Sequence, residues 1–292
     1  MPDSQLKIYW LACRPKTLPA AAAPVIIGTA MAFADKSFHL LSALAALFGA
    51  LFIQIGTNLA NDYFDFKKGS DREDRLGPTR VTQSGLMSPH AVKNATIIAF
   101  ALAFLVGIYL VFRGGLPIVV IGLSSILFGV LYTGGKYPIG YIGFGELFVL
   151  IFFGPVAVGG TYYVQTLTIN NNVLIAGFAP GLFSSAILVV NNLRDIKSDR
   201  ISGKKTLAVR FGESFSKSQF VLFVAVGALL PVYFYLQSNN IFHLLPAIVI
   251  IPSLIVLKNI FKQTGKELNN LLAQTGKLLF FYSLLFAIGW VI

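Results

Sequence analysis

The sequence predicts an all-α membrane protein with nine transmembrane helices, and its composition and hydrophobic pattern both point to this fold class. Apolar residues make up 55% of the 292 residues and charged residues only 12%, whereas soluble domains carry about 25% charged residues. The apolar residues are concentrated in long runs. The single cysteine, Cys13, excludes an intramolecular disulfide framework. We therefore expect one integral-membrane domain over residues 1–292.

Nine apolar runs are candidates for membrane-spanning helices. A helix needs about 20 mostly apolar residues to cross the hydrocarbon core, and about 17 are tolerated. The first four runs are Leu18–Ala34, Leu40–Ala60, Ala95–Phe112 and Leu116–Tyr132. The first of them follows basic residues and resembles a signal peptide, but eight further runs follow it, so we interpret it as a spanning helix.

The remaining five runs continue the pattern to the end of the sequence. They are Ile142–Tyr163, Val173–Val190, Phe220–Leu236, Ile241–Leu257 and Leu278–Ile292. The last run is short and can be extended back to Gly276. Glycine and proline inside several runs are compatible with spanning helices, because neighbouring helices can satisfy the freed backbone groups.

The distribution of lysine and arginine gives these helices one orientation. Of the 23 basic residues, all but Lys36 and Arg113 lie in the N-terminal segment or in the connections two to three, four to five, six to seven and eight to nine. Nine spans place all of these segments on one side, and basic residues favour the cytoplasmic side. The sequence therefore predicts a cytoplasmic N-terminus, and topology explains the net charge of +11 better than nucleic-acid binding does.

Acidic and amide residues gather where the second span ends and open a loop of about residues 58–90. The cluster contains Asn58, Asn61, Asp62 and Asp65, with Asp71 further along. If the second span continues as a helix, residues three or four apart share a face of it. Two carboxylates and an amide oxygen would then converge on one cation.

A second cluster follows the sixth span and opens a connection of about residues 191–216. It contains Asn191, Asn192, Asp195 and Asp199, and its two carboxylates lie four residues apart on one helical face. Each cluster taken alone also fits ordinary helix caps and turns. Their presence together, at equivalent ends of two spans, favours a shared functional site.

Paired carboxylates at a membrane boundary repel each other, so the two clusters need a cation. Mg²⁺ typically takes one or two protein carboxylates, keeps several waters and bridges to substrate phosphates. Two clusters that face each other across a cavity would fit two Mg²⁺ ions around a diphosphate. Nearby basic residues are candidates for neutralising phosphate charge, although topology alone also explains them; they are Arg72, Arg75, Arg80, Arg194, Lys197, Lys204 and Lys205.

These residues resemble the UbiA-type family of intramembrane aromatic prenyltransferases. That family has nine helices around a central cavity, an Asn-Asp-x-x-Asp motif after helix two and an Asp-x-x-x-Asp motif after helix six. Here the motifs are matched by Asn61–Asp65 and Asp195–Asp199, and a family Tyr-x-x-x-Lys feature by Tyr132–Lys136. One departure is the spacing after Asp65, because the next aspartate is Asp71 and not the fourth residue on, which weakens Asp71 as a ligand.

Within the family, several stretches resemble the branch that prenylates 1,4-dihydroxy-2-naphthoate on the way to menaquinone. Among them are Arg14–Ala20, Gly145–Phe148, Gly154–Val158 and Lys205–Gly212. The resemblance implies transfer of a polyprenyl group from an allylic diphosphate to this aromatic acid, with loss of CO₂ to give demethylmenaquinol. It also implies a multi-pass protein of the cytoplasmic membrane, with its active-site loops on the cytoplasmic side.

The resemblance also implies roles for individual residues. Mg²⁺, as two ions, is expected on Asp62, Asp65, Asp195 and Asp199, with Asn58, Asn61 and Asp71 as further ligands. Groups expected to bind the substrate or to support the metal ligands are Asn191, Asn192, Arg72, Arg80, Arg194, Lys204, Lys205 and Tyr132. Lys136 is a phosphate-binding candidate. Glu146 lies inside a predicted span and is a functional candidate for that reason; it either orients the acceptor or a nearby base, or is a structural partner of Lys136.

Two alternatives stay open. The acceptor could be 4-hydroxybenzoate, homogentisate or the vinyl group of haem, because the sequence identifies it only by resemblance. A cation-coupled transporter would also place acidic residues within the membrane, but transporter sites usually lie near the midplane. The acids here lie at span ends, which favours the enzyme. The length of the prenyl chain depends on the dimensions of the cavity.

Overall fold

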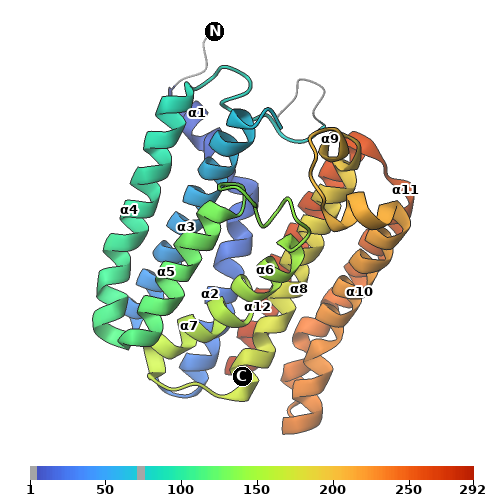
Figure 1. Cartoon of the computed structure of the whole chain (residues 1–292). Coiled ribbons are helices and arrows are strands. Elements are labelled where there is room, and N and C mark those ends of the chain that lie inside the picture. Colours follow the sequence, from blue (N-terminus) through green and yellow to red (C-terminus); the bar gives the residue numbers. More distant parts are fainter. Residues whose placement is uncertain (1–4, 71–75) are drawn as a thin grey trace.

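The computed structural model describes residues 5–70 and 76–292, and the regular structure of these residues is entirely helical (Figure 1). In this part of the chain, eight helices or consecutive helix pairs are long and apolar enough to cross a membrane, and α5 is a shorter apolar helix at the fourth predicted span. The predicted fold class is confirmed, and the count of nine spans stays a prediction. The helices are α1 (Gln5–Ala12), η1 (Pro15–Thr17), α2 (Leu18–Ala34), α3 (Leu40–Lys67), α4 (Pro89–Gly114), α5 (Leu116–Leu131), α6 (Gly145–Phe152), α7 (Pro155–Thr166), α8 (Asn171–Arg194), α9 (Ile196–Ile201), α10 (Leu207–Ser238), η2 (Ile241–Val249), α11 (Ile250–Lys262), η3 (Gly265–Glu267) and α12 (Leu268–Val291).

Several helices extend beyond the apolar runs that predicted them. Helix α3 continues to Lys67, so Asn58, Asn61, Asp62 and Asp65 of the first acidic cluster are all helical. Helix α10 begins at Leu207 instead of Phe220 and has a non-helical residue at Gly212. Helix α12 begins at Leu268 instead of Leu278. The apolar runs therefore locate the hydrophobic part of each helix, while polar turns carry the helix further.

The fifth predicted span is broken, and its prediction as one helix from Ile142 was wrong. Helix α6 begins at Gly145, and the chain breaks at Gly154 before α7. A Cβ atom on Gly154 would lie 2.7 Å from the Gly177 carbonyl oxygen, and one on Gly181 would lie 2.4 Å from the Leu150 carbonyl oxygen. Because glycine has no Cβ, the break can press against α8 at these positions. Hydropathy alone does not reveal such a break, but the dipeptide Gly154–Pro155 is typical of one.

The buried core is built around α8, which runs through the bundle beside α2, α7, α10 and α12. Its fully buried Phe183 contacts Tyr282 of α12, with ring centroids 5.5 Å apart. Helices α3, α4 and α5 form the other flank (Figure 1). This arrangement brings the C-terminal ends of α3 and α8 to the same end of the bundle, where α9 also lies.

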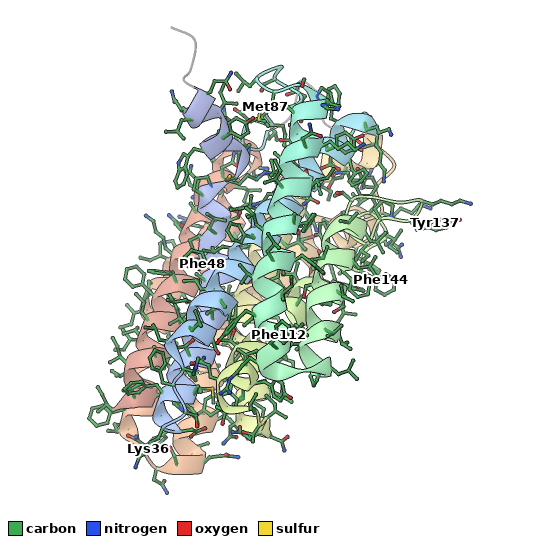
Figure 2. The ribbon with its side chains drawn as sticks, turned by 90° about the vertical axis from the view of Figure 1, so that its left-hand side faces the viewer. Lys36, Phe48, Met87, Phe112, Tyr137 and Phe144 are labelled. Atoms are coloured by element: carbon green, nitrogen blue, oxygen red, sulfur yellow. The ribbon has the colours of Figure 1, made fainter. Side chains whose placement is uncertain are left out.

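The two ends of the bundle differ in what they carry. Figure 1 shows the N-terminal segment and α9 at one end and the C-terminus at the other. Figure 2 places Lys36 at the end opposite Met87, a buried residue of the segment between α3 and α4. Both acidic clusters therefore lie at the end that is opposite Lys36.

Candidate active site

A cavity of about 230 Å³ lies where the C-terminal ends of α3 and α8 meet, and we call it the polar pocket. The structure brings residues of both acidic clusters together on its walls. They are Asn61, Asp65, Asn191, Asn192, Asp195 and Asp199. Two segments more than a hundred residues apart in sequence thus contribute to one site.

Asp65 is the buried carboxylate through which the first cluster faces this pocket. It accepts a hydrogen bond from Arg80 Nη2 at 3.1 Å and one from the Tyr141 hydroxyl at 2.6 Å. The Lys204 ammonium lies 3.8 Å from its Oδ1 atom. Three separate segments therefore supply positive charge or a hydroxyl donor to one carboxylate, which compensates its burial.

The second cluster faces the same pocket through Asp195 and Asp199. Arg194 binds the Asp195 carboxylate with both Nε and Nη2, at 2.8 and 2.5 Å. Lys204 Nζ lies 3.4 Å from Asp199 Oδ1, so this one ammonium stands between Asp65 and Asp199. Burial raises the pKa of Asp199 to about 6; Lys204 opposes this shift and Asp195 adds to it. Asp199 is therefore a carboxylate that a further cation would stabilise in its charged form.

The helical spacing divides the end of α3 into two faces with different contacts. Asn61 and Asp65, four residues apart, line the pocket. Asn58 and Asp62, also four apart, face away from it. Asp62 accepts hydrogen bonds from the backbone amides of Val81 and Thr82 at 3.1 and 3.2 Å. As a metal ligand, Asp62 stays a prediction, because its carboxylate would have to leave these amides.

Asn58 fastens the N-terminal segment to α3. Its side-chain amide donates to the Thr17 hydroxyl at 2.9 Å and to the Cys13 carbonyl at 3.3 Å. These contacts hold the turn that precedes α2, and two residues of that turn, Arg14 and Lys16, line the polar pocket. In this geometry the amide nitrogen of Asn58 makes supporting contacts, and its role as a metal ligand stays a prediction.

Glu146 lies behind the pocket wall and not on it. Its carboxylate accepts a hydrogen bond from the Asn192 side-chain amide at 2.9 Å, and its backbone carbonyl accepts one from Ser185. Asn192 is the residue that reaches the pocket. The expected pairing of Glu146 with Lys136 is not formed in the structure. The other expected role, orienting the acceptor or a nearby base, stays a prediction.

The basic residues predicted to bind phosphate are distributed between the pocket and the surface. Arg80 and Lys204 line the pocket. Arg194 is buried and already bound to Asp195, Asn191 and Asn269, so it supports the site without facing it. Asp71 and Arg72 lie outside the described residues.

Lys136 and Lys205 are exposed and do not line the pocket. The turn after α5, with Gly135 at φ 77°, directs the chain outward. The Lys136 ammonium lies 5.5 Å from the ring of Tyr137, which Figure 2 shows projecting away from the bundle. A phosphate contact by either lysine stays a prediction that requires this loop or the one before α10 to move.

Tyr141 is a site residue that the sequence did not identify. Its hydroxyl binds Asp65 and lies 2.9 Å from Ser70 Oγ. Its ring lies between two ammonium groups, with Lys204 Nζ at 4.6 Å and Lys68 Nζ at 5.0 Å from the centroid. It belongs to an irregular segment between α5 and α6, where no helical periodicity indicates the direction of a side chain.

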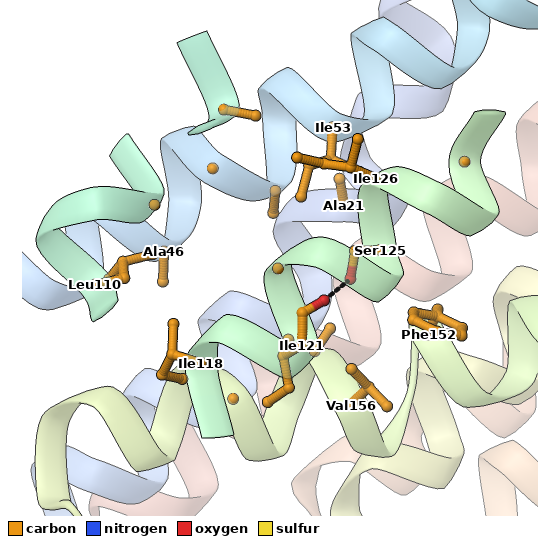
Figure 3. A pocket seen from close by; sticks show the side chains of 18 of the residues that line it. Ala21, Ala46, Ile53, Leu110, Ile118, Ile121, Ser125, Ile126, Phe152 and Val156 are labelled. Atoms are coloured by element: carbon orange, nitrogen blue, oxygen red, sulfur yellow. Dashed lines mark hydrogen bonds between the residues drawn. The ribbon is translucent and has the colours of Figure 1, made fainter. Parts of the chain in front are cut away.

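A second and larger cavity, of about 520 Å³, lies in the apolar part of the bundle (Figure 3) and adjoins the polar pocket. We call it the apolar cavity. The two share the residues Gln54, Tyr132, Val149 and Phe153. The hydroxyl of Ser125 donates to the Ile121 carbonyl within α5 at 2.7 Å. Its hydrogen is therefore already used within the helix and is not free for a ligand in the cavity.

Tyr132 lies at the junction of the two cavities and is held there by glycines. A Cβ atom on Gly140 would lie 2.9 Å from the Tyr132 ring, and one on Gly145 would lie 3.0 Å from its hydroxyl oxygen. The close approach of these two residues fixes the ring between the polar and apolar spaces. Tyr132 thus lines both cavities, and its role in binding the substrate stays a prediction.

The donor set of the polar pocket fits a hard divalent cation such as Mg²⁺. Within residues 5–70 and 76–292, no three acidic, histidine or cysteine side chains form a closed metal cluster. Mg²⁺ does not need one, because it is usually bound through one or two carboxylates and completed by water and phosphate oxygens. Asp65, Asp195 and Asp199 supply such carboxylates on facing walls.

Comparisons with known proteins give one consistent result. The model of the UbiA prenyltransferase family matches residues 21–288. The 1,4-dihydroxy-2-naphthoate octaprenyltransferase of Haemophilus influenzae is 34% identical over 311 residues, covering 100% of this chain and 98% of that protein. The Escherichia coli protein of the same name is 45% identical over 211 residues, covering 70% and 68%. A solved UbiA homolog from Archaeoglobus fulgidus, bound to GPP and Mg²⁺, shares the fold with a TM-score of 0.68, 18% identity and coverage of 97% and 98%.

Proposed function

Since this chain belongs to the UbiA prenyltransferase family, we propose that it transfers a polyprenyl group from an allylic diphosphate to 1,4-dihydroxy-2-naphthoate, with loss of CO₂ to give demethylmenaquinol. The observation that carries the proposal is the junction of a charged pocket with a long apolar cavity at Tyr132. An allylic diphosphate has the same two parts. The names of the Haemophilus and Escherichia relatives support the naphthoate as acceptor.

The diphosphate belongs in the polar pocket and the prenyl chain in the apolar cavity. Arg80 and Lys204 are positioned to bind phosphate oxygens, because both already face the carboxylates that share the pocket. The bond that breaks then lies near Tyr132, at the boundary between the two spaces. Phe153 and Tyr132 offer aromatic faces there for the positive charge that develops on the allylic carbon.

Mg²⁺, in two ions bound by Asp65, Asp195 and Asp199 with water, would stabilise the negative charge that develops on the leaving diphosphate. Arg194 holds Asp195 in place through a bidentate hydrogen-bonded contact, and the Tyr141 hydroxyl holds Asp65. Glu146 fixes the amide of Asn192. These supports keep the ligands in one arrangement, which is the condition for electrostatic stabilisation of a transition state.

The aromatic acid belongs in the same pocket beside the mouth of the apolar cavity at Tyr132, where its ring carbon can reach the allylic carbon. Arg14 and Lys16 supply positive charge for its carboxylate, and Ile187 and Leu188 supply an apolar wall for its rings. The buried hydroxyl of Ser184 has no hydrogen-bond partner among the described residues. It is available to a hydroxyl of the naphthoate.

The protein is a multi-pass membrane protein, and we place the polar pocket on the cytoplasmic side of the cytoplasmic membrane. The end of the bundle that carries the pocket is opposite Lys36 (Figure 2). Basic residues of the described connections, among them Arg14, Arg80 and Lys204, line the pocket at this end, which agrees with the preference of lysine and arginine for the cytoplasmic side. A diphosphate made in the cytoplasm would reach the pocket from that side.

Activity of the purified protein in detergent tests this proposal. The assay contains 1,4-dihydroxy-2-naphthoate, farnesyl diphosphate and either Mg²⁺ or EDTA, and it measures prenylated product and CO₂. We expect product only with Mg²⁺. Asp195→Asn should abolish turnover, while Asp35→Asn, at the opposite end of the bundle, should leave it intact. Turnover of 4-hydroxybenzoate in place of the naphthoate would overturn the acceptor and keep the metal site.

A further inference from the structure

The first turns of α12 border the polar pocket, although the residues assigned to the reaction come from other segments. Leu272 and Gly276 line the pocket from this helix, and both lack a polar side chain. The half-buried Asn269, three residues before Leu272, is polar and contacts groups that support the pocket's carboxylates. Its contacts show what α12 contributes to the site.

Asn269 completes the set of acceptors around the buried guanidinium of Arg194. Its Oδ1 atom accepts a hydrogen bond from Arg194 Nη1 at 2.7 Å. Nε and Nη2 of the same guanidinium bind Asp195, and Nη2 also donates to Asn191. Because the Arg194 side chain is 0% exposed, Nη1 cannot turn to water when Asn269 is replaced. Asn269 therefore helps to hold the guanidinium that orients the Asp195 carboxylate.

The side-chain nitrogen of Asn269 binds a second segment of the site. Nδ2 donates to the Leu76 carbonyl at 2.8 Å and to the Lys266 carbonyl at 3.0 Å. Leu76 belongs to the connection between α3 and α4, and four residues later this connection carries Arg80, the partner of Asp65. One amide group thus ties the end of α8 to the connection that follows α3.

The position of Asn269 near the start of a helix does not account for these contacts. An asparagine there commonly bonds to backbone groups a few residues away, as Asn269 does with Lys266. The contacts with Arg194 and Leu76 instead span 75 and 193 residues of sequence. They need a side chain that accepts and donates at once, as an amide does, whereas a carboxylate has no donor and an apolar side chain has neither group.

We propose that Asn269 is a positioning residue of the reaction, whose amide holds Arg194, and through it Asp195, in register with the connection that carries Arg80. The proposal deepens the proposed function and rests on it, because Asp195 acts there on Mg²⁺ and Arg80 on the diphosphate. The two contacts of the amide have separate consequences. The bond to Arg194 supports the affinity for Mg²⁺, and the bond to Leu76 supports the affinity for the diphosphate.

The test compares variants of Asn269 with MgCl2 and inorganic pyrophosphate as probes. Each probe is titrated into the purified protein in detergent with the other at saturation, and the rise of the unfolding temperature reports binding. Asn269→Leu removes both contacts, and it should need about 10-fold more of each probe for half of the maximal rise, since hydrogen bonds to charged groups carry at least this factor. With farnesyl diphosphate, kcat/KM should fall as well.

Asn269→Asp separates the two contacts, because a carboxylate keeps an acceptor for Arg194 and loses the donor to Leu76. It should need the wild-type concentration of Mg²⁺ and more pyrophosphate, and it tests the proposal even where the leucine variant does not fold. Asn270→Leu makes the same change on an exposed neighbour that does not line the pocket, so it is the control and should bind both probes as the wild type does.

Two results would overturn the role of Asn269. One is a lower unfolding temperature of Asn269→Leu without ligand but with both half-maximal concentrations unchanged, which is the result of a merely structural contact. The other is an equal loss of Mg²⁺ affinity in Asn269→Asp and Asn269→Leu, which would exclude the bond to Arg194 as its cause. Wild-type protein that does not respond to Mg²⁺ and pyrophosphate would instead overturn the proposed function, so the two failures are distinguishable.

Discussion

The carboxylates of the polar pocket depend on single residues from other segments. Asp65 on α3 is held by Arg80 from the loop after it, by Tyr141 from the segment before α6 and by Lys204 from the loop before α10. When a buried carboxylate loses one hydrogen-bond donor, the cost of burying its negative charge is less well compensated. The contribution of each support can therefore be measured by removing one group at a time.

Tyr141→Phe removes the hydroxyl that donates to Asp65 and keeps the ring between Lys68 and Lys204. We expect kcat/KM to fall about 10- to 100-fold, since a hydrogen bond to a charged group contributes about 1.5–3 kcal/mol. The Mg²⁺ concentration needed for half-maximal activity should rise with it. Tyr137→Phe, on an exposed side chain outside the pocket, is the control. Unchanged Mg²⁺ dependence in Tyr141→Phe would show that the contact with Asp65 has no functional role.

Glu146 is hydrogen-bonded to Asn192, and substitutions can distinguish the effect of this hydrogen bond from the effect of the negative charge of Glu146. Glu146→Gln keeps an oxygen that accepts from Asn192, so its activity should stay close to wild type. Glu146→Ala leaves the buried Asn192 amide unsatisfied, at a cost of about 1–3 kcal/mol. The double variant with Asn192→Ala should lose no more activity than Asn192→Ala alone. Inactivity of Glu146→Gln would instead assign a direct role to the carboxylate.

At the scale of helices, the break between α6 and α7 sets how closely this part of the chain approaches α8. A Cβ atom on Gly177 would lie 2.6 Å from Pro155 Cα. Pro155 opens α7, a position that suits proline because its missing N–H is not needed there. The residues that follow, including Val156 and Gly160, line the apolar cavity. The glycine contact thus fixes one of the cavity's walls.

Gly177→Ala should destabilise the protein by about 1–3 kcal/mol, the usual cost of overpacking. The apparent unfolding temperature in detergent should fall accordingly. Gly107→Ala is the control for stability, because its Cβ atom would meet open space. Equal unfolding temperatures of the two variants would contradict the close packing at α8.

The sequence was sufficient to identify most of the helices but not their irregularities. Apolar runs revealed α4 and α5 because length and composition alone define such helices. The break at Gly154 was missed because glycine and proline were accepted within spanning runs, although Gly154–Pro155 is a dipeptide typical of turns. The acidic spacing located the site, but residues three apart on a helix differ by about 60° in direction. Asp65 therefore lines the pocket while Asp62 binds the loop amides, a distinction that only the rotation of α3 decides.

For the whole molecule, the asymmetry of basic residues predicts that opposite ends of the bundle face opposite sides of the membrane. Lys36 and Lys205 are both exposed and belong to opposite predicted sides. In a Cys13→Ser background, Lys36→Cys should react with an impermeant maleimide in right-side-out vesicles. Lys205→Cys should react only after permeabilisation. Labelling of both from the same side would contradict the predicted number of spans between them.

The neutralised state of the polar pocket has a consequence for the thermodynamics of binding. Asp65 and Asp199 already have protein cations as neighbours, so a lone Mg²⁺ ion must compete with Lys204, and Arg80 adds to this competition at Asp65. A diphosphate gives the displaced cations new partners. Each ligand then lowers the cost of binding the other, and because such coupling is reciprocal, both affinities rise by the same factor. Titration calorimetry should find weak binding of either ligand alone and tight binding of the two together.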